Sequence, residues 1–286
     1  MIQFASNAMM DELKTLWLEG FEGDDEYCAF FFKHYFSCEN CVVHTNDRGE
    51  VEAAVYIFRG KVNISGREHA VLFLYAVATF RKYRNMGKFS AICSFLADYC
   101  RENSRGIIAL STTPPSRSPC EKLGMLPKIN MGAVSVVLDR AVNAYPCEQC
   151  GYAEFAAMRK AFLDRDFDIC WPDETLKYMH SEMQTSGDIV KTVINNSTYY
   201  AAYTRLEDEL LIRETNCPPD DMPAMIDSVC AYIHYQGKIT IYTRADTVLA
   251  LKNTISQEVF CYAHMWFIDE TLDIPNASWY INLTAE

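Results

Sequence analysis

The apolar residues of this chain fall into short continuous runs and helical stripes that alternate along its length. Residues 71–77 are nearly all apolar, which predicts a strand buried on both faces. Three basic residues within 81–84 follow, and Gly87 then supplies backbone freedom for a turn. Apolar residues recur every three or four positions through 90–100, which predicts an amphipathic helix. The centre of the first half is therefore a strand, a basic turn and a helix.

The same reasoning divides the rest of the chain into two similar series of elements, separated by a boundary at 143–151 where Pro146 and Gly151 interrupt regular structure. In the first half we expect helices over 7–21, 26–36 and 120–123, and strands over 2–5, 41–45, 51–58, 106–110 and 134–138. In the second half we expect helices over 151–167, 173–184 and 222–235, and strands over 189–195, 198–206, 209–216, 238–244, 259–268 and 279–283.

The turn after the central strand has the features of an anion-binding site. The first backbone N–H groups of a helix have no partner within the helix, and the helix dipole favours negative charge there. A glycine-bearing turn that delivers the chain into such a helix can hold a diphosphate.

The residues of this turn resemble a known motif. Arg84-x-x-Gly87-x-Phe89 is similar to the R/Q-x-x-G-x-G/A loop with which GNAT acetyltransferases grip the pyrophosphate of acetyl-CoA. Val77-Ala78-Thr79 precedes it, and the segment EKLGM at 121–125 resembles the E-K-L-G-F signature downstream. Phe89 stands where a small residue is usual, which is common in the branch that resembles the Eis acetyltransferases.

This resemblance implies a fold of the α/β class, with an α+β mixed sheet whose fourth and fifth strands splay apart to admit the cofactor. It implies a catalytic GNAT domain over 1–142 and a degenerate GNAT-like domain over 152–286, without the third, sterol-carrier-like region that Eis-type proteins usually add. The residues it implies for cofactor binding are Val77, Ala78, Thr79, Arg84, Asn85, Met86, Gly87, Lys88, Phe89 and Ser90.

The second half departs from the motif at the corresponding position. Residues 217–223 read CPPDDMP, which contains no glycine. Pro218 and Pro219 lack N–H donors, and Asp220 and Asp221 repel a diphosphate. We therefore expect this half not to bind CoA.

The implied function is transfer of an acetyl group from acetyl-CoA, the acyl-donor substrate, to a primary amine of a small or cationic acceptor. Many members of the family have a tyrosine acid at the position of Cys120, and Eis-type enzymes bring their terminal carboxylate, here Glu286, into the site. Asp24, Glu26 and Phe30 lie where acceptor loops form in this fold. A non-catalytic module that binds CoA or a protein, and an acyltransferase for longer acyl groups, stay open as alternatives.

The composition of the chain limits the kinds of molecule that we expect it to bind. With 286 residues and a net charge of −12, the chain lacks the basic balance of a nucleic-acid-binding protein, and its acidity suits either a cationic acceptor or simple solubility. The first residues do not form a secretory signal, and no apolar run is long enough to span a membrane, so we expect a cytoplasmic protein with no membrane partner. The pairs Cys38/Cys41 and Cys147/Cys150 are too far apart for the usual zinc spacing, so no metal is expected. Monomer and homodimer both stay open.

Overall fold

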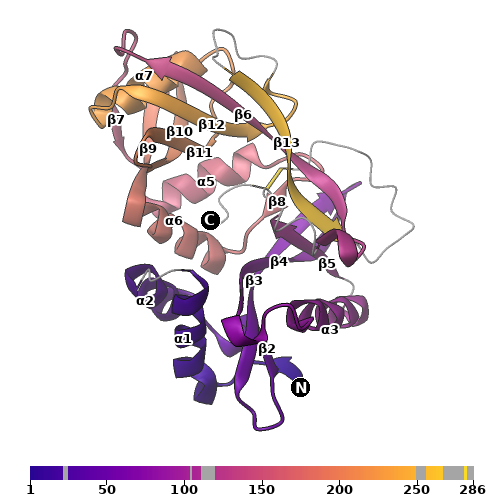
Figure 1. Ribbon diagram of the computed structural model, residues 1–286. Helices are drawn as coiled ribbons and strands as arrows, with labels where there is room; N and C mark the ends of the chain where they lie inside the picture. Colours follow the sequence, from indigo (N-terminus) through magenta and orange to yellow (C-terminus); the bar gives the residue numbers. More distant parts are fainter. Residues whose placement is uncertain (22–24, 104, 111–119, 249–255, 267–279, 282–286) are drawn as a thin grey trace. The chain divides into compact units, whose positions relative to one another are not determined.

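The structure is a computed structural model that describes residues 1–286 except 22–24, 104, 111–119, 249–255, 267–279 and 282–286 (Figure 1). Its internal contacts divide the chain into two units. Unit 1 comprises Met1–Lys61, Glu68–Pro127 and Ala263–Ile274, and unit 2 comprises Val62–Arg67, Lys128–Tyr262 and Pro275–Glu286.

Unit 1 is a mixed sheet with helices packed against it. Its longer helices are α1 (Met10–Gly20), α2 (Asp25–His34) and α3 (Lys88–Glu102), and residues 120–122 form the short helix expected there. Its strands are β1 (Ile2–Phe4), β2 (Cys41–Thr45), most of β3 (Val51–Ile64), most of β4 (Arg67–Thr79), β5 (Arg105–Leu110) and the end of β13 (Ser256–Trp266). The strands lie in the order β1-β2-β3-β4-β5-β13. β4 and β5 are parallel, whereas β1 with β2, β2 with β3, and β5 with β13 are antiparallel.

Unit 2 is built on the same plan. Its described helices are α5 (Tyr152–Phe162), α6 (Asp173–Ser186) and α7 (Met222–Tyr232), and its strands include most of β6 (Leu126–Leu138), β7 (Cys147–Gln149), β8 (Ile169–Cys170), β9 (Gly187–Ile194), β10 (Ser197–Arg205), β11 (Glu209–Thr215) and β12 (Gly237–Arg244). Its sheet runs β6-β12-β11-β10-β9-β7. The pair β11 and β12 is parallel, as β4 and β5 are in unit 1.

The repeat expected from the sequence is present in the order of the elements. The series β1-α1-α2-β2-β3-β4-α3-β5 is followed, after β6, by β7-α5-β8-α6-β9-β10-β11-α7-β12, which matches the first series except for the short strand β8. The mixed α/β class and the repetition of one series of elements in the two halves are thus confirmed. The expected boundary at 143–151, however, contains a strand, because Cys147–Gln149 pairs with β9 as the edge strand β7.

Each unit contains a strand from the other half of the sequence. The segment 134–138 was expected to complete the first half, but it belongs to β6, which pairs antiparallel with β12 from Met131–Arg244 through Leu138–Gly237. In return, residues 263–266 of β13 pair with β5 in unit 1. The expected domains 1–142 and 152–286 stay a prediction, and the contacts of the described chain follow a different division.

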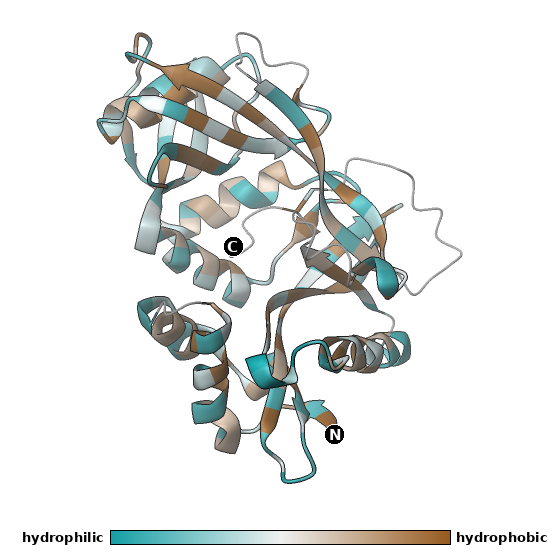
Figure 2. Cartoon of the chain, in the orientation of Figure 1, coloured by the Kyte–Doolittle hydropathy of each residue, from teal (hydrophilic) through white to brown (hydrophobic). Residues whose placement is uncertain are grey.

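The two faces of the sheet in unit 1 pack against different side chains, one mainly aliphatic and the other mainly aromatic. Leu72, Leu74 and Ile107 pack on one face with the buried side of α3, and that side of the helix is Ile92, Cys93, Leu96 and Cys100. The opposite face carries Phe73 and Tyr75, which alternate with those leucines along β4 and contact aromatic rings of α2 and β3. The apolar core of unit 2 lies under α7, around Met225 and Val229. Figure 2 shows the resulting alternation of hydrophobic and hydrophilic bands along β12.

Candidate active site

The turn between β4 and α3 is held in shape by contacts to the strands before it. Arg84 Nε donates a hydrogen bond to the carbonyl of Thr79 at 3.1 Å, and the amide of Phe80 donates to the carbonyl of Glu52 at 3.1 Å. Asn85 and Gly87 both have left-handed backbone, with φ of 63° and 72°. These two positions fold the chain back so that α3 begins directly at Lys88.

The start of α3 presents backbone donors to this turn. The first helical hydrogen bond runs from the Ala91 amide to the Gly87 carbonyl at 2.9 Å, so the amides of residues 88–90 precede it and are available to a ligand. Arg81, Lys82 and Arg84 are exposed around the turn. Amide donors, the positive end of a helix dipole and exposed cations together suit a diphosphate. The structure thus brings the predicted residues 84–90 into one turn.

Lys88 differs from the expectation because its side chain is engaged in the protein interior. Its Nζ lies 2.7 Å from Oε2 of Glu52, a side chain that is only 7% exposed. His44 Nδ1 lies 2.8 Å from the same oxygen. Burial acts to raise the pKa of Glu52, but the hydrogen bond and charge of Lys88 outweigh it and hold that pKa below its usual value. The ammonium group of Lys88 therefore neutralises the buried carboxylate of Glu52.

The motif residues before the turn have separate roles. Val77 is exposed, Ala78 is buried, and Thr79 supplies the carbonyl that holds Arg84. Ala76, just before them, has φ of 46°, a left-handed conformation that is uncommon for a residue with a side chain. The regular pleat of β4 is therefore interrupted between Tyr75 and Val77.

The described pairing of β4 with β5 ends just before this interruption. It runs from Ala70–Arg105 to Leu74–Ala109, whereas β4 continues to Thr79. The last residues of β4 extend beyond this described register. The segments 77–79 and 84–90, which were expected to bind the cofactor, both follow this point along the chain.

The structure describes two of the three residues that were expected to bind the acceptor. Phe30 on α2 is partly buried and Glu26 is exposed, whereas Asp24 lies outside the described residues. Phe31 and Phe32, which follow Phe30 on the same helix, are buried in the core. The Trp17 ring stacks on Phe31 with centroids 4.6 Å apart.

The two expected catalytic groups are not brought together in the described part of the chain. Cys120 is 2% exposed and belongs to the apolar core beneath α3, with Ile92 and Leu96. Burial and the neighbouring Cys120 raise the pKa of Cys93 to about 12. Glu286 lies outside the described residues. A catalytic role for either group stays a prediction.

Two polar features of unit 1 were missed by the sequence analysis. His264 on β13 is buried, and its Nε2 lies 4.0 Å from Oε1 of Glu121 in the EKLGM segment. The hydroxyls of Tyr27 and Tyr75 lie 2.7 Å apart. The signal for both was weak, because one histidine in an apolar strand and two distant tyrosines have no fixed spacing.

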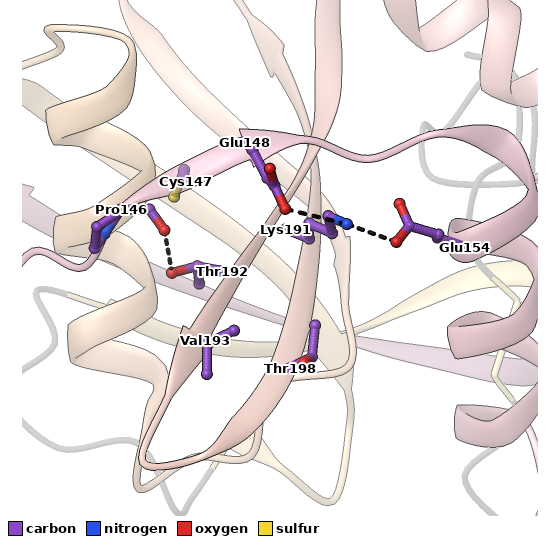
Figure 3. A pocket seen from close by; sticks show the side chains of 8 residues that line it. All are labelled: Pro146, Cys147, Glu148, Glu154, Lys191, Thr192, Val193 and Thr198. Atoms are coloured by element: carbon purple, nitrogen blue, oxygen red, sulfur yellow. Dashed lines mark hydrogen bonds and ion pairs between the residues drawn. The ribbon is translucent and has the colours of Figure 1, made fainter.

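Unit 2 has an open pocket that none of the predicted site residues lines. Its volume is about 480 Å³, and Figure 3 shows its lining by Pro146, Cys147, Glu148, Glu154, Lys191, Thr192, Val193 and Thr198. Lys191 Nζ pairs with Glu154 at 2.6 Å and with Glu148 at 3.1 Å. These hydrogen bonds raise the pKa of Lys191, so the pocket holds a charge-paired ammonium and not a reactive amine.

In unit 2, an aspartate stands at the position that corresponds to the turn at 84–90 of unit 1. Asp221 directly precedes α7, and its carboxylate accepts hydrogen bonds from Asn195 Nδ2 at 2.9 Å and from the Tyr199 hydroxyl at 2.8 Å. The turn of unit 2 therefore carries a negative charge where unit 1 carries exposed cations.

The part of the chain that the structure describes was considered for metal sites and for membrane-spanning helices. Within it, no group of three or more histidine, cysteine or acidic side chains is arranged to hold a metal ion. None of its helices is both long and apolar enough to cross a membrane.

The turn lies in a part of the chain that matches the model of a known protein family. The model of the acetyltransferase (GNAT) domain matches residues 2–118. This part of the chain therefore resembles a GNAT acetyltransferase domain. The match covers the turn, α3 and the strands around them, and a search of curated protein sequences gives no significant match for the chain.

Solved structures share the fold over most of the chain. A GCN5-related N-acetyltransferase from Anabaena variabilis superposes with a TM-score of 0.73 at 14% identity, over 94% of this chain and 73% of that one. A probable N-acyltransferase from Enterococcus faecalis gives 0.71 at 14% identity, over 94% and 72%. Eis1 from Mycobacterium abscessus gives 0.62 at 8% identity, over 94% and 74%. Over most of its length, the chain thus shares its fold with these proteins.

Proposed function

We propose that this protein transfers an acetyl group from acetyl-CoA to a primary amine of a small or cationic acceptor. The observation that carries this proposal is the turn at 84–90, in which a left-handed Gly87 delivers the chain into α3 with the amides of 88–90 available. Backbone donors at a helix N-terminus suit the diphosphate that distinguishes CoA from other thiols. The GNAT match over residues 2–118 supports the same acyl donor.

The acceptor is proposed from charge and from the neighbourhood of α2. The chain carries a net charge of −12, which attracts cations, and α2 begins with Asp25 and Glu26. The partly buried Phe30 lies one turn further along the same helix. An amine that is protonated in solution would be drawn to this end of α2, and the aromatic ring offers a face that favours cations.

The energetics identify the step that most needs help. An amine with a pKa of about 10.4 is almost wholly protonated at neutral pH, and releasing its proton costs up to about 4.6 kcal/mol. The CoA thiol, with a pKa of about 8.5, leaves with little assistance. A buried Cys120 is therefore compatible with turnover, because the departing sulfur does not depend on an acid.

Two measurements test the proposal. Calorimetry should show that acetyl-CoA binds the intact protein, and a thiol-release assay with a panel of primary amines should show turnover, with acetylated product identified by mass. Binding without turnover on any amine would favour a non-catalytic CoA module. Faster turnover with longer acyl-CoA would favour a different acyl group. Absence of CoA binding would overturn the proposed function.

A further inference from the structure

Two tyrosines of unit 1 join hydroxyl to hydroxyl beside the interruption in β4. The Tyr75 hydroxyl on β4 lies 2.7 Å from the Tyr27 hydroxyl on α2. Tyr75 is 7% exposed, whereas Tyr27 is half-buried, so the pair leads from the sheet toward the surface. The hydrogen bond therefore joins a buried tyrosine to a less buried one.

The position of Tyr75 links the pair to the candidate active site. Tyr75 follows Leu74, which is paired with Ala109 in the last described pair between β4 and β5, and it precedes the left-handed Ala76. Leu74 packs on the α3 face of the sheet, so Tyr75 points to the opposite face, which α2 covers. Glu26 and Phe30, the acceptor residues proposed above, belong to the same helix as Tyr27.

An aromatic frame fixes both rings. The Trp17 ring lies 6.2 Å from Tyr27 and 6.0 Å from Tyr75, centroid to centroid. Phe58 and Phe31 contact Tyr75 at 4.8 Å and 5.6 Å. Because these contacts restrict the rings, the two hydroxyls are held at hydrogen-bond distance, as a proton-transfer path requires.

We propose that Tyr75 and Tyr27 form a proton relay for the acceptor amine, an inference that rests on the proposed acetyl transfer. The amine nitrogen forms a bond to the thioester carbonyl carbon, and collapse of the adduct breaks the carbon–sulfur bond. The nitrogen gives a proton to the Tyr75 oxygen while Tyr75 passes its own proton to Tyr27 and Tyr27 releases one to water. Of the two protons that an ammonium loses overall, one ends on the CoA sulfur and one in solvent.

The relay suits the chemistry of the amine. A phenol and an alkyl amine have similar ordinary pKa values, about 10 and about 10.4, so the transfer between them is close to balanced. Each tyrosine receives one proton and gives one, so neither carries a charge when the relay is complete. Such a path removes the need for a carboxylate or histidine base at the amine.

Phenylalanine substitutions test the relay because they remove only the hydroxyls. Tyr75→Phe and Tyr27→Phe should each lower kcat on an amine acceptor by about 10²-fold, with acetyl-CoA affinity unchanged. The double variant should be no slower than the slower single variant, because the two groups act as one path. The wild-type solvent deuterium isotope effect should indicate more than one proton in motion and should fall in both variants.

The control is another tyrosine of the same aromatic frame. The Tyr35 hydroxyl donates to the Ile57 carbonyl at 3.4 Å, so Tyr35→Phe removes a hydroxyl from this frame without touching the relay, and kcat should stay within about twofold. Two results would overturn the relay alone, provided that the wild type is active. In the first, kcat is unchanged in Tyr75→Phe and Tyr27→Phe. In the second, the losses of kcat in the two single variants multiply in the double variant. Wild type that turns over no amine would overturn the proposed function and the relay together.

Discussion

At the scale of single residues, the conformation of Gly87 decides the shape of the candidate CoA turn. Its φ of 72° is one that side chains rarely adopt, although a Cβ there would meet nothing within 4 Å. Gly87→Val should therefore cost about 1–2 kcal/mol through backbone strain and not through a clash. Because the strain falls on the turn that presents the amides of α3, acetyl-CoA affinity measured by calorimetry should fall at least tenfold.

Gly49 provides the matched control for this prediction. It has φ of 83° and an equally open surrounding, but it lies in the hairpin between β2 and β3. Gly49→Val should lose a similar amount of stability and keep its acetyl-CoA affinity, while Gly87→Asn, which tolerates the left-handed region, should restore most of the binding. Equal binding by Gly87→Val and wild type would count against the turn as the CoA site.

The cluster of Glu52, Lys88 and His44 makes stability depend on pH. Burial lowers the pKa of His44, and the charge of Lys88 lowers it further, against an opposing effect of Glu52. A histidine whose folded pKa lies below its unfolded value of about 6.5 stabilises the fold above that pH, and this contribution is lost as the pH falls toward the folded pKa. The depressed pKa of Glu52 acts in the same direction at lower pH, below about 4.3.

We therefore expect the Tm to fall as the pH is lowered from about 7.5 to about 5.5, and to fall less in His44→Gln, which does not titrate. The charged groups that act on His44 are Lys88, Glu52 and the amino terminus of Met1. Parallel Tm curves for His44→Gln and wild type would show that other groups carry the dependence.

At the scale of elements, a buried ion pair docks α5 onto the sheet of unit 2. Arg159 Nε lies 2.8 Å from Oε1 of Glu214 on β11, and the Tyr200 hydroxyl donates to the same oxygen at 2.8 Å. Arg159→Met should cost about 3–5 kcal/mol, because Glu214, which is fully buried, would keep an uncompensated charge.

The paired variant Arg159→Met with Glu214→Leu removes both charges and should recover most of that loss in denaturant unfolding. The exposed pair Lys61–Glu68, at 2.7 Å, is the comparison, and Lys61→Met should change stability by less than about 1 kcal/mol. A loss in the double variant as large as in Arg159→Met alone would show that the arginine acts through packing and not through charge.

Elements with a strong local pattern could be predicted from the sequence. The apolar run at 71–77 and the helical stripe at 90–100 correspond to β4 and α3, since each pattern matches the burial that the element receives. The turn at 84–90 could be predicted as well, because a glycine among basic residues, between a buried strand and an amphipathic helix, is typical of an anion-binding turn. The helix predicted over 151–167 ends at Phe162 instead. The residues that follow it bond to distant backbone, as when Asp166 accepts from the Ser65 amide, and no local pattern reports such a contact.

The parts of the site that depend on distant pairings could not be predicted. Tyr27 and Tyr75 lie 48 residues apart in sequence, and their hydroxyls meet only because α2 packs on one face of β4. The engagement of Lys88 by Glu52 likewise depends on where β3 begins relative to α3. His264 becomes part of unit 1 only because β13 pairs with β5.

At the scale of the whole molecule, the exchange of strands ties the two halves of the sequence together. Unit 1 needs residues 263–266 to cover β5, and unit 2 needs β6 to cover β12. A chain cut between residues 142 and 152 would leave each fragment with one uncovered strand edge, and such edges promote aggregation.

We therefore expect fragments 1–142 and 152–286 to be unfolded or aggregated when made separately, and to bind acetyl-CoA only when they are produced together. Intact protein should unfold in a single transition, because loss of either unit removes a strand from the other. Gel filtration and calorimetry of the separate and co-produced fragments measure this. A folded fragment 1–142 that binds acetyl-CoA as tightly as the intact chain would refute the dependence on β13. A folded fragment 152–286 that binds acetyl-CoA would show that Asp221 and its neighbours do not exclude the diphosphate from the second turn.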